Sequence, residues 1–284
     1  MRTGGGGRSL GGGVAVGGGL TGIILVALFV LLQGGSTDDV LQAVGGGGQP
    51  GEQGTAGHIG ECTAEQANTS RDCRLSATAH ALDVFWEPLI TAAGTKFVVP
   101  EVESFTGATS TGCGNATSAV GPFYCPADKT IYIDLGFYDQ LSKYNIKDGP
   151  LAEEYITAHE YGHHIQNLLG TMRQVGRDTG ATSGSVRLEL QADCYAGMWA
   201  GHAATTVDPR TGVTFLDPIT KDQLANAQAA AKGVGDDRIQ ASSGMTINPD
   251  TWTHGSAEQR ERWFMVGYNK GTLASCDTFV VANP

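Results

Sequence analysis

The sequence predicts an α+β protein that is mainly helical, with a small β-sheet beside one of its helices. Long stretches carry apolar residues at helical spacing, whereas two short stretches of β-branched and aromatic residues lie between turn formers. A third observation is the run of residues 159–163, His-Glu-Tyr-Gly-His. Residues four apart lie on one face of an α-helix, so a helix would place the two imidazoles side by side. With 284 residues, 40% of them hydrophobic, the chain can form one sizeable domain.

The N-terminal region predicts an anchor and a tether. Residues 1–12 are a glycine-rich tail, and residues 13–32 carry no charge over about the twenty residues that a transmembrane helix needs. Arginines precede this stretch and acidic residues follow it, so we expect a single-pass protein of the cell membrane with a cytoplasmic tail. Residues 33–60 predict a flexible linker, and residues 61–284 an extracytoplasmic domain. The alternative is a cleaved secretory signal, although no clear Ala-x-Ala cleavage site follows the apolar stretch.

The first half of the domain combines one helix with short strands. Leu75–Leu89 has apolar residues at helical spacing, and Pro88 should bend or end that helix. Lys96–Pro100 and Thr130–Leu135 are β-branched and aromatic, so both predict strands, with a loop at Gly112–Gly114 between them. The second strand could form a sheet edge to which an extended substrate adds, but a core strand is the favoured interpretation.

The second half predicts four helices. The first begins at Asp148 or Gly149, either of which can be its cap, with Pro150 in the first turn; it contains residues 159–163 and ends at Gly170. The others cover Val186–Ala200, Lys221–Lys232, and a segment that opens with a capping box at Ser256 and ends by residue 271.

The HExxH run of residues 159–163 indicates a zinc site. His159 and His163 would offer two ligands from one helix face, with Glu160 beside them as the general base. The alternative is a surface helix that carries His and Glu for solubility. Catalytic zinc uses three protein ligands and an open position, and Glu189 on the next helix is our candidate third ligand. Asp193, one turn further, could accept the free ring N–H of a ligand histidine. The alternative for both carboxylates is ordinary solvation on a helix surface.

These segments resemble the bacterial putative neutral zinc metallopeptidase family, whose members are membrane-anchored and of the zincin type. The resemblance extends from Cys62 to Cys276 and rests on residues 159–166, 189–197, 121–126 and 254–260. The second helix also resembles the zinc-ligand helix of the CAAX prenyl protease group, in which the glutamate of an E-x-x-A-D run binds zinc. The resemblance implies a zincin-like fold and a gluzincin ligand set around one catalytic Zn²⁺.

The implied activity is that of a membrane-anchored zinc endopeptidase acting on a peptide or protein substrate. Zinc lowers the pKa of its bound water towards about 7, and Glu160 takes the proton and returns it to the leaving amine. His254 is the candidate second donor to the oxyanion, with a surface or capping histidine as the alternative. Arg260 and Arg262 are expected to be solvated, and His164, about 100° around the helix from His163, should lie off the ligand face.

Two other functions fit parts of the pattern. A zinc hydrolase of a non-protein amide would use the same residues. An exported interaction module with a structural zinc would not need Glu160, and would fill the fourth position with Cys or His, for which only His164 and Cys194 are near in sequence. The formal charge of −11 and the pI near 5.0 argue against nucleic acid as a partner, since a phosphate backbone would be repelled.

The six cysteines agree with export to an oxidising compartment, where an even number can pair completely. Local pairing predicts Cys62 with Cys73 and Cys113 with Cys125, which leaves Cys194 for Cys276; six cysteines allow 15 connectivities. Buried free thiols are the alternative.

Overall fold

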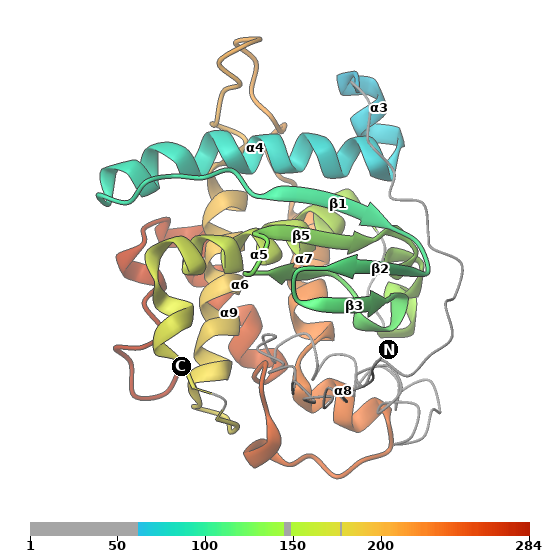
Figure 1. Cartoon of the computed structure of the whole chain (residues 1–284), viewed down its shortest axis with the longest axis vertical. Coiled ribbons are helices and arrows are strands. Elements are labelled where there is room, and N and C mark those ends of the chain that lie inside the picture. The colour runs from blue at the N-terminus through green and yellow to red at the C-terminus, as the bar shows by residue number, and fades with distance from the viewer. Residues whose placement is uncertain (1–61, 145–148, 177) are drawn as a thin grey trace, which may run out of the picture.

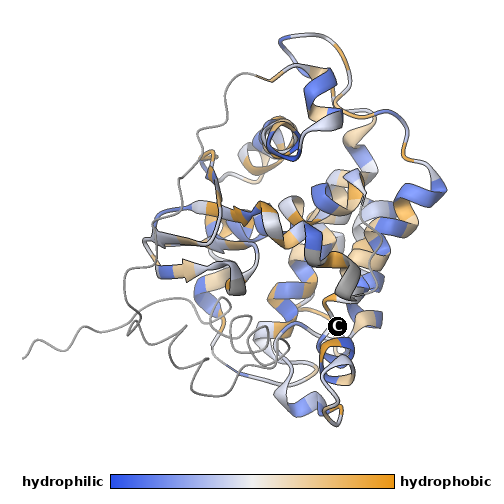
Figure 2. Cartoon of the chain, turned by 90° about the vertical axis from the view of Figure 1, so that its right-hand side faces the viewer, coloured by the Kyte–Doolittle hydropathy of each residue, from blue (hydrophilic) through white to orange (hydrophobic). Residues whose placement is uncertain are grey.

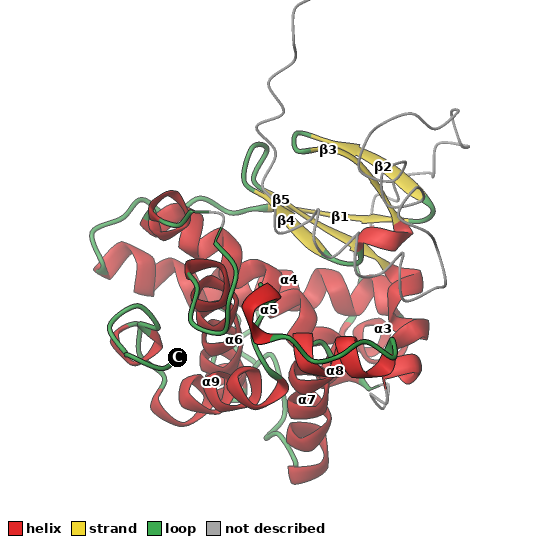
Figure 3. Ribbon diagram, turned by 90° about the horizontal axis from the view of Figure 1, so that it is seen from below, coloured by secondary structure: helices red, strands yellow, loops and turns green. Residues whose placement is uncertain are grey.

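Helices enclose the core of the domain, and the strands lie along one side of it (Figures 1 and 3). The computed structural model describes residues 62–144, 149–176 and 178–284. It is mostly helical with a small sheet, so the predicted α+β class is confirmed. The described α-helices are α3 (Ala64–Thr69), α4 (Arg71–Ala92), α5 (Pro150–Leu169), α6 (Gly184–Ala203), α7 (Lys221–Gly233), α8 (Asp236–Ser242) and α9 (Ala257–Lys270).

The predicted tail, transmembrane segment and linker, residues 1–60, lie outside the described residues. Among the helices that the structure does describe, none has both the length and the apolar character that a bilayer span demands.

The sheet has more strands than the sequence predicts, and their bounds differ. Its strands run in the order β1 (Glu101–Phe105), β5 (Thr130–Asp134), β4 (Phe123–Cys125), with β1 parallel and β4 antiparallel to β5. The predicted Thr130 strand is therefore central, and the alternative of a sheet edge is wrong. A separate antiparallel hairpin joins β2 (Ala108–Thr111) to β3 (Gly114–Thr117) around the predicted loop.

The predicted strand at Lys96–Pro100 is wrong, since pairing starts only at Glu101, opposite Thr130. Two local features explain the late start. Pro100 has no N–H to donate to a ladder. The carbonyl of Val98 accepts a hydrogen bond of 2.6 Å from the His164 ring instead of from a neighbouring strand.

The helices of the second half begin and end close to their predicted limits. In α5, Pro150 occupies the first turn, and Gly170 ends the helix in the left-handed conformation with a φ of 81°. Helix α9 opens with the predicted capping box at Ser256. Helix α4 is longer than expected, because it continues past Pro88 to Ala92. The short helices α3 and α8 were not predicted.

Helix α6 is the centre of the packing and lies against α5 on one side and α9 on the other. Its contact with α9 is close because glycines of each helix lie against the backbone of the other: a Cβ at Gly197 would lie 2.0 Å from the carbonyl oxygen of Phe264. Fully buried aromatic side chains, including Trp86 and Trp199, fill the space around it. Hydrophilic and hydrophobic residues both occur along the helices (Figure 2).

All three predicted disulfides are present: Cys62–Cys73, Cys113–Cys125 and Cys194–Cys276. The third joins α6 to the C-terminal segment across 82 residues of sequence. Free thiols are therefore excluded among the described residues, which include every cysteine of the chain.

Candidate metal centre

The HExxH residues of α5 and the acidic residues of α6 are brought together where the two helices touch. Gly162, in the middle of the motif, lies against α6, and a Cβ there would lie 3.1 Å from both the Cα and the carbonyl oxygen of Ala192. Any larger side chain at Gly162 would separate the helices. The small residue therefore lets the ligand face of α5 approach that of α6.

Three side chains converge at this contact with the geometry of a metal site. His159 Nε2 lies 3.1 Å from one carboxylate oxygen of Glu189, and His163 Nε2 lies 3.5 Å from the other. All three side chains are buried, and their ligand atoms lie within 4.8 Å of one another. Zinc bonds of 2.0–2.1 Å in a tetrahedral site separate neighbouring ligand atoms by about 3.3 Å. Two imidazoles and a carboxylate at this spacing therefore fit a zinc ion, and the alternative of a solvated Glu189 is wrong.

The pKa shifts of these groups indicate that the site favours positive charge. Burial would raise the pKa of Glu189, but His163 and His254 hold it well below its usual range. Burial would likewise lower the pKa of His159, yet Asp193 and Glu189 raise it to about 10. The raised pKa values of both imidazoles favour their protonated forms beside Glu189. A divalent cation would compete with these protons for the same nitrogens.

The ring of His159 is held from behind by a buried charge cluster. Its Nδ1 lies 2.8 Å from Asp193 Oδ1, and this places the Nδ1 proton between ring and carboxylate and leaves Nε2 facing Glu189. Asp193 also accepts a hydrogen bond from the Tyr155 hydroxyl and two of 2.9 Å from the Arg260 guanidinium. Asp193 is fully buried, so the alternative of a solvated carboxylate is wrong.

The expectation that Arg260 is solvated is wrong, since only 3% of this residue is exposed. Its guanidinium neutralises Asp193, and that pairing lets a carboxylate remain charged away from water. The signal was present in the sequence, because α9 places residue 260 one turn after the capping box that follows His254. Charged side chains are nevertheless exposed more often than buried, so the spacing alone favoured a solvated Arg260. Arg262 is exposed, as expected.

His163 is held by a neutral partner that the sequence analysis missed. Its Nδ1 lies 2.9 Å from the side-chain oxygen of Gln166, which is fully buried. Residues three apart share a helix face, so the signal was the position of a glutamine one turn after the second histidine.

Glu160 is buried beside the three candidate ligands but makes no hydrogen bond to the residues that the structure describes. Burial raises the pKa of its carboxyl, while His159 and His163 act in the opposite direction. A carboxylate with a raised pKa and no hydrogen-bond partner among the described side chains is suited to accept a proton from water and to release it again.

His254 lies close enough to the site for its charge to affect Glu189. Asp236 holds it in place by accepting a hydrogen bond of 2.7 Å from the His254 backbone N–H, and its other oxygen lies 3.3 Å from Nδ1. The residue is 2% exposed, and its Nε2 is buried without a hydrogen-bond partner among the described residues. The alternative of a surface histidine is therefore wrong.

Neither predicted candidate for a fourth protein ligand is available. Cys194 forms a disulfide with Cys276. His164 is buried on another side of α5, where its ring nitrogens meet the Tyr124 hydroxyl and the Val98 carbonyl. Burial lowers the pKa of His164 to about 4, so this ring stays neutral.

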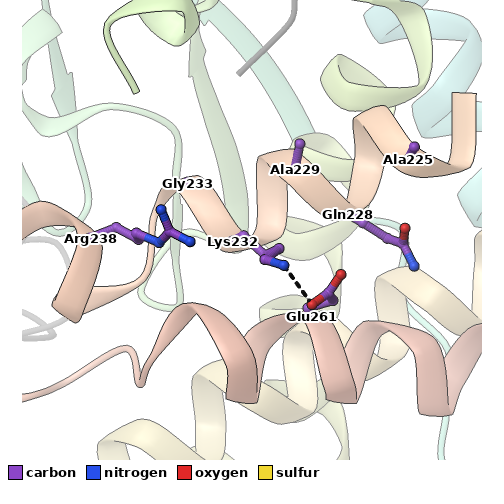
Figure 4. A pocket seen from close by; sticks show the side chains of 7 residues that line it. All are labelled: Ala225, Gln228, Ala229, Lys232, Gly233, Arg238 and Glu261. Carbon is purple, nitrogen blue, oxygen red and sulfur yellow. Dashed lines mark ion pairs between the residues drawn. The ribbon is translucent and has the colours of Figure 1, made fainter. Parts of the chain in front are cut away.

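A surface hollow of about 300 Å³ is lined by residues of α7, α8 and α9 (Figure 4). An ion pair of 2.9 Å between Lys232 and Glu261 crosses it. None of the candidate site residues lines it.

The fold and the site together define a class of protein, one that carries an HExxH helix and a following glutamate in the ligand pattern of zinc-dependent hydrolases. The chain belongs to the family described as putative neutral zinc metallopeptidase, whose model matches residues 1–279. The family assignment predicted from the motifs is thereby confirmed.

The relatives found for this chain carry no described activity. It is 47% identical over 228 residues to the uncharacterized protein Rv2575 of Mycobacterium tuberculosis, covering 79% of this chain and 76% of the relative. It is 42% identical over 200 residues to the uncharacterized protein YpfJ of Escherichia coli, covering 68% of this chain and 66% of that relative. No solved structure matches the chain.

Proposed function

We propose that the protein is a membrane-anchored, zinc-dependent endopeptidase in which His159, His163 and Glu189 hold one Zn²⁺. The observation that carries this proposal is the buried convergence of two imidazoles and a carboxylate, which are zinc ligands, beside a Glu160 side chain that has no hydrogen-bond partner among the described residues. A structural zinc would need a fourth Cys or His, whereas Cys194 and His164 are both engaged elsewhere. Two histidines and a glutamate are the gluzincin ligand set, which favours a zincin-like arrangement.

Each residue around the metal has a defined task in this proposal. Bound zinc would supply a Lewis acid that polarises the scissile carbonyl and lowers the pKa of water to about 7. Glu160 accepts the proton of the attacking water and delivers it to the leaving amine. Burial would lower the pKa of His254, but Glu189 and Asp236 raise it, so the protonated ring can donate from Nε2 to the oxyanion that develops on the carbonyl. Asp193 holds His159 so that its Nε2 faces the metal.

We place this site outside the cytoplasmic membrane, with residues 13–32 as the anchor. Three disulfides within the described domain support an oxidising compartment. The uncharged N-terminal stretch and the arginines before it support the orientation.

The test compares the full-length chain with Glu160→Gln for zinc content and for cleavage of a peptide library. We expect one zinc per chain in both proteins and a loss of cleavage of at least about 100-fold in the variant, because the general base is gone. Glu101→Gln, an exposed glutamate at the start of β1, is the matched control and should cleave like wild type. Equal activity of Glu160→Gln and wild type would refute Glu160 as the base. Zinc binding without cleavage in any of the three would favour the interaction module or a non-protein amide as substrate.

A further inference from the structure

We propose that Gln166 and Gln191 form a positioning relay that fixes the tautomer of His163 so that its Nε2 faces the metal. The inference rests on the proposed zinc site and adds the residues that orient its second histidine. It gives His163 a partner that differs in kind from the Asp193 carboxylate behind His159.

The relay is a continuous chain of buried hydrogen bonds from the ligand to the protein backbone. His163 Nδ1 lies 2.9 Å from Gln166 Oε1. The Gln166 amide nitrogen donates to the Leu188 carbonyl at 2.7 Å and to Gln191 Oε1 at 3.1 Å. The Gln191 amide nitrogen then donates to the Cys276 carbonyl at 3.1 Å. Gln166 is fully buried and Gln191 is 5% exposed, so water does not offer either amide an alternative set of partners.

The donor and the acceptor of each hydrogen bond in the relay follow from the two backbone carbonyls at which the relay ends. A carbonyl oxygen can only accept, so the amide nitrogens of Gln166 and Gln191 must face Leu188 and Cys276. The side-chain oxygen of Gln166 then has to face His163, and an oxygen without a proton can only accept from that ring. Nδ1 must therefore carry a proton. In the neutral imidazole the remaining lone pair is on Nε2, the nitrogen that lies beside Glu189.

The burial of two glutamines in a helix contact has a cost that supports this role. Each amide loses its hydration when buried, whereas leucine would fill a similar volume without that loss. Residues 166 and 191 also join α5 and α6 beside the ligands, so a purely structural role as a helix contact is the competing explanation. The two roles predict different zinc affinities when the acceptor for His163 is removed: only a positioning role predicts weaker binding.

The experiment measures the zinc dissociation constant of the full-length chain by chelator competition and identifies the metal-bound nitrogen of His163 by ¹⁵N NMR. In wild type we expect zinc on Nε2 and a proton on Nδ1. Gln166→Leu removes the acceptor and should weaken zinc binding about 10- to 100-fold, the usual effect of losing such a partner. Gln166→Glu keeps an acceptor for Nδ1–H but loses the donor to Leu188 and Gln191, so its zinc dissociation constant should lie between those of wild type and Gln166→Leu.

Gln240→Leu is the matched control, because Gln240 is also buried and bonded to the side chain of Trp252 but belongs to α8. It should lower stability without changing the zinc dissociation constant. The relay is overturned if wild type binds zinc through Nδ1 of His163, a result that needs no variant to fold. It is also overturned if Gln166→Leu loses stability as the control does while its zinc affinity is unchanged. A zinc affinity that depends on Gln166 in a chain without peptide cleavage would refute the proposed activity and leave the relay intact.

Discussion

His159 and His163 differ in what holds the ring nitrogen that faces away from Glu189. A carboxylate, Asp193, lies behind the first, and a neutral amide, Gln166, lies behind the second. The charge of Asp193 is balanced by Arg260, so the excess negative charge near the metal comes from Glu189 and Glu160. That excess suits a divalent cation, whereas a second carboxylate behind His163 would add a charge with no partner.

Replacing His254 tests its role at the reaction centre. In His254→Ala we expect kcat to fall about 10²- to 10³-fold, the usual effect of removing one oxyanion donor. Zinc content should stay at one per chain, because His254 is not among the three converging ligands. Steady-state kinetics and metal analysis on the same sample check both statements. An unchanged kcat would remove His254 from the mechanism.

Glu154 on α5 should make stability depend on pH. Burial raises the pKa of its carboxyl from 4.5 to about 7, while Arg74 opposes that rise. Between these two pH values the folded chain binds more protons than the unfolded chain, so the free energy of unfolding falls as pH rises. Glu154→Gln removes this loss, and we expect the variant to gain at least about 1 kcal/mol over wild type between about pH 5 and pH 8.

Urea unfolding of both chains at several pH values provides the measurement. Parallel curves for wild type and Glu154→Gln would contradict the raised pKa. The comparison cancels other titrating groups, since these are the same in both chains.

Sequence reasoning found the ligand candidates because their chemistry is local. The spacing of His159 and His163 is readable from the sequence, and Glu189 and Asp193 became candidates because they lie on the helix that follows this motif. The roles of Arg260 and Gln191 were missed because their partners are distant. Asp193 lies 67 residues from Arg260, and Gln166, the partner of Gln191, is on another helix. Only the packing of α5, α6 and α9 reveals that these polar groups are buried.

At the scale of elements, the contact between α6 and α9 determines whether the site assembles. Helix α6 carries Glu189 and Asp193, and α9 carries Arg260. The backbones touch at glycines, and a Cβ at Gly267 would lie 1.9 Å from the carbonyl oxygen of Cys194. Such an overlap can be relieved only by moving one helix away from the other.

Gly267→Ala should therefore destabilise the domain by about 1–3 kcal/mol or more, the usual range for overpacking. This loss should occur although alanine favours a helix over glycine by about 1 kcal/mol. Thermal unfolding checks the stability, and zinc titration should show weaker binding because Asp193 and Arg260 separate. Gly176→Ala is the control, since a Cβ there meets nothing within 4 Å. Equal stability of Gly267→Ala and the control would show that the helix contact is not as close as described.

Helices were predicted well and strands poorly, for a physical reason. Helix limits at Pro150, Gly170 and Ser256 are set by residues next to them in sequence. Strands such as β1 depend on a partner, and β1 pairs only where β5 offers a register, from Glu101 onward. β4 has three residues, too few to give a pattern of its own.

At the scale of the whole molecule, the three disulfides fasten separate parts of the domain. Cys113–Cys125 ties the hairpin to the sheet, and Cys194–Cys276 ties the ligand helix to the C-terminal segment. Cys62–Cys73 secures the described N-terminal end, from which the predicted linker leads to the predicted anchor. Local pairing of cysteines was enough to predict this pattern, because two of the bridges span only 11 and 12 residues.

The central claim is a three-ligand zinc site with an open fourth position. X-ray diffraction from zinc-loaded crystals of the full-length chain, recorded on both sides of the zinc absorption edge, tests it most directly. We predict one anomalous peak per chain, bonded to Nε2 of His159, Nε2 of His163 and the carboxylate of Glu189, with water as the remaining ligand. A peak at another place, or a fourth protein ligand in place of water, would contradict the claim.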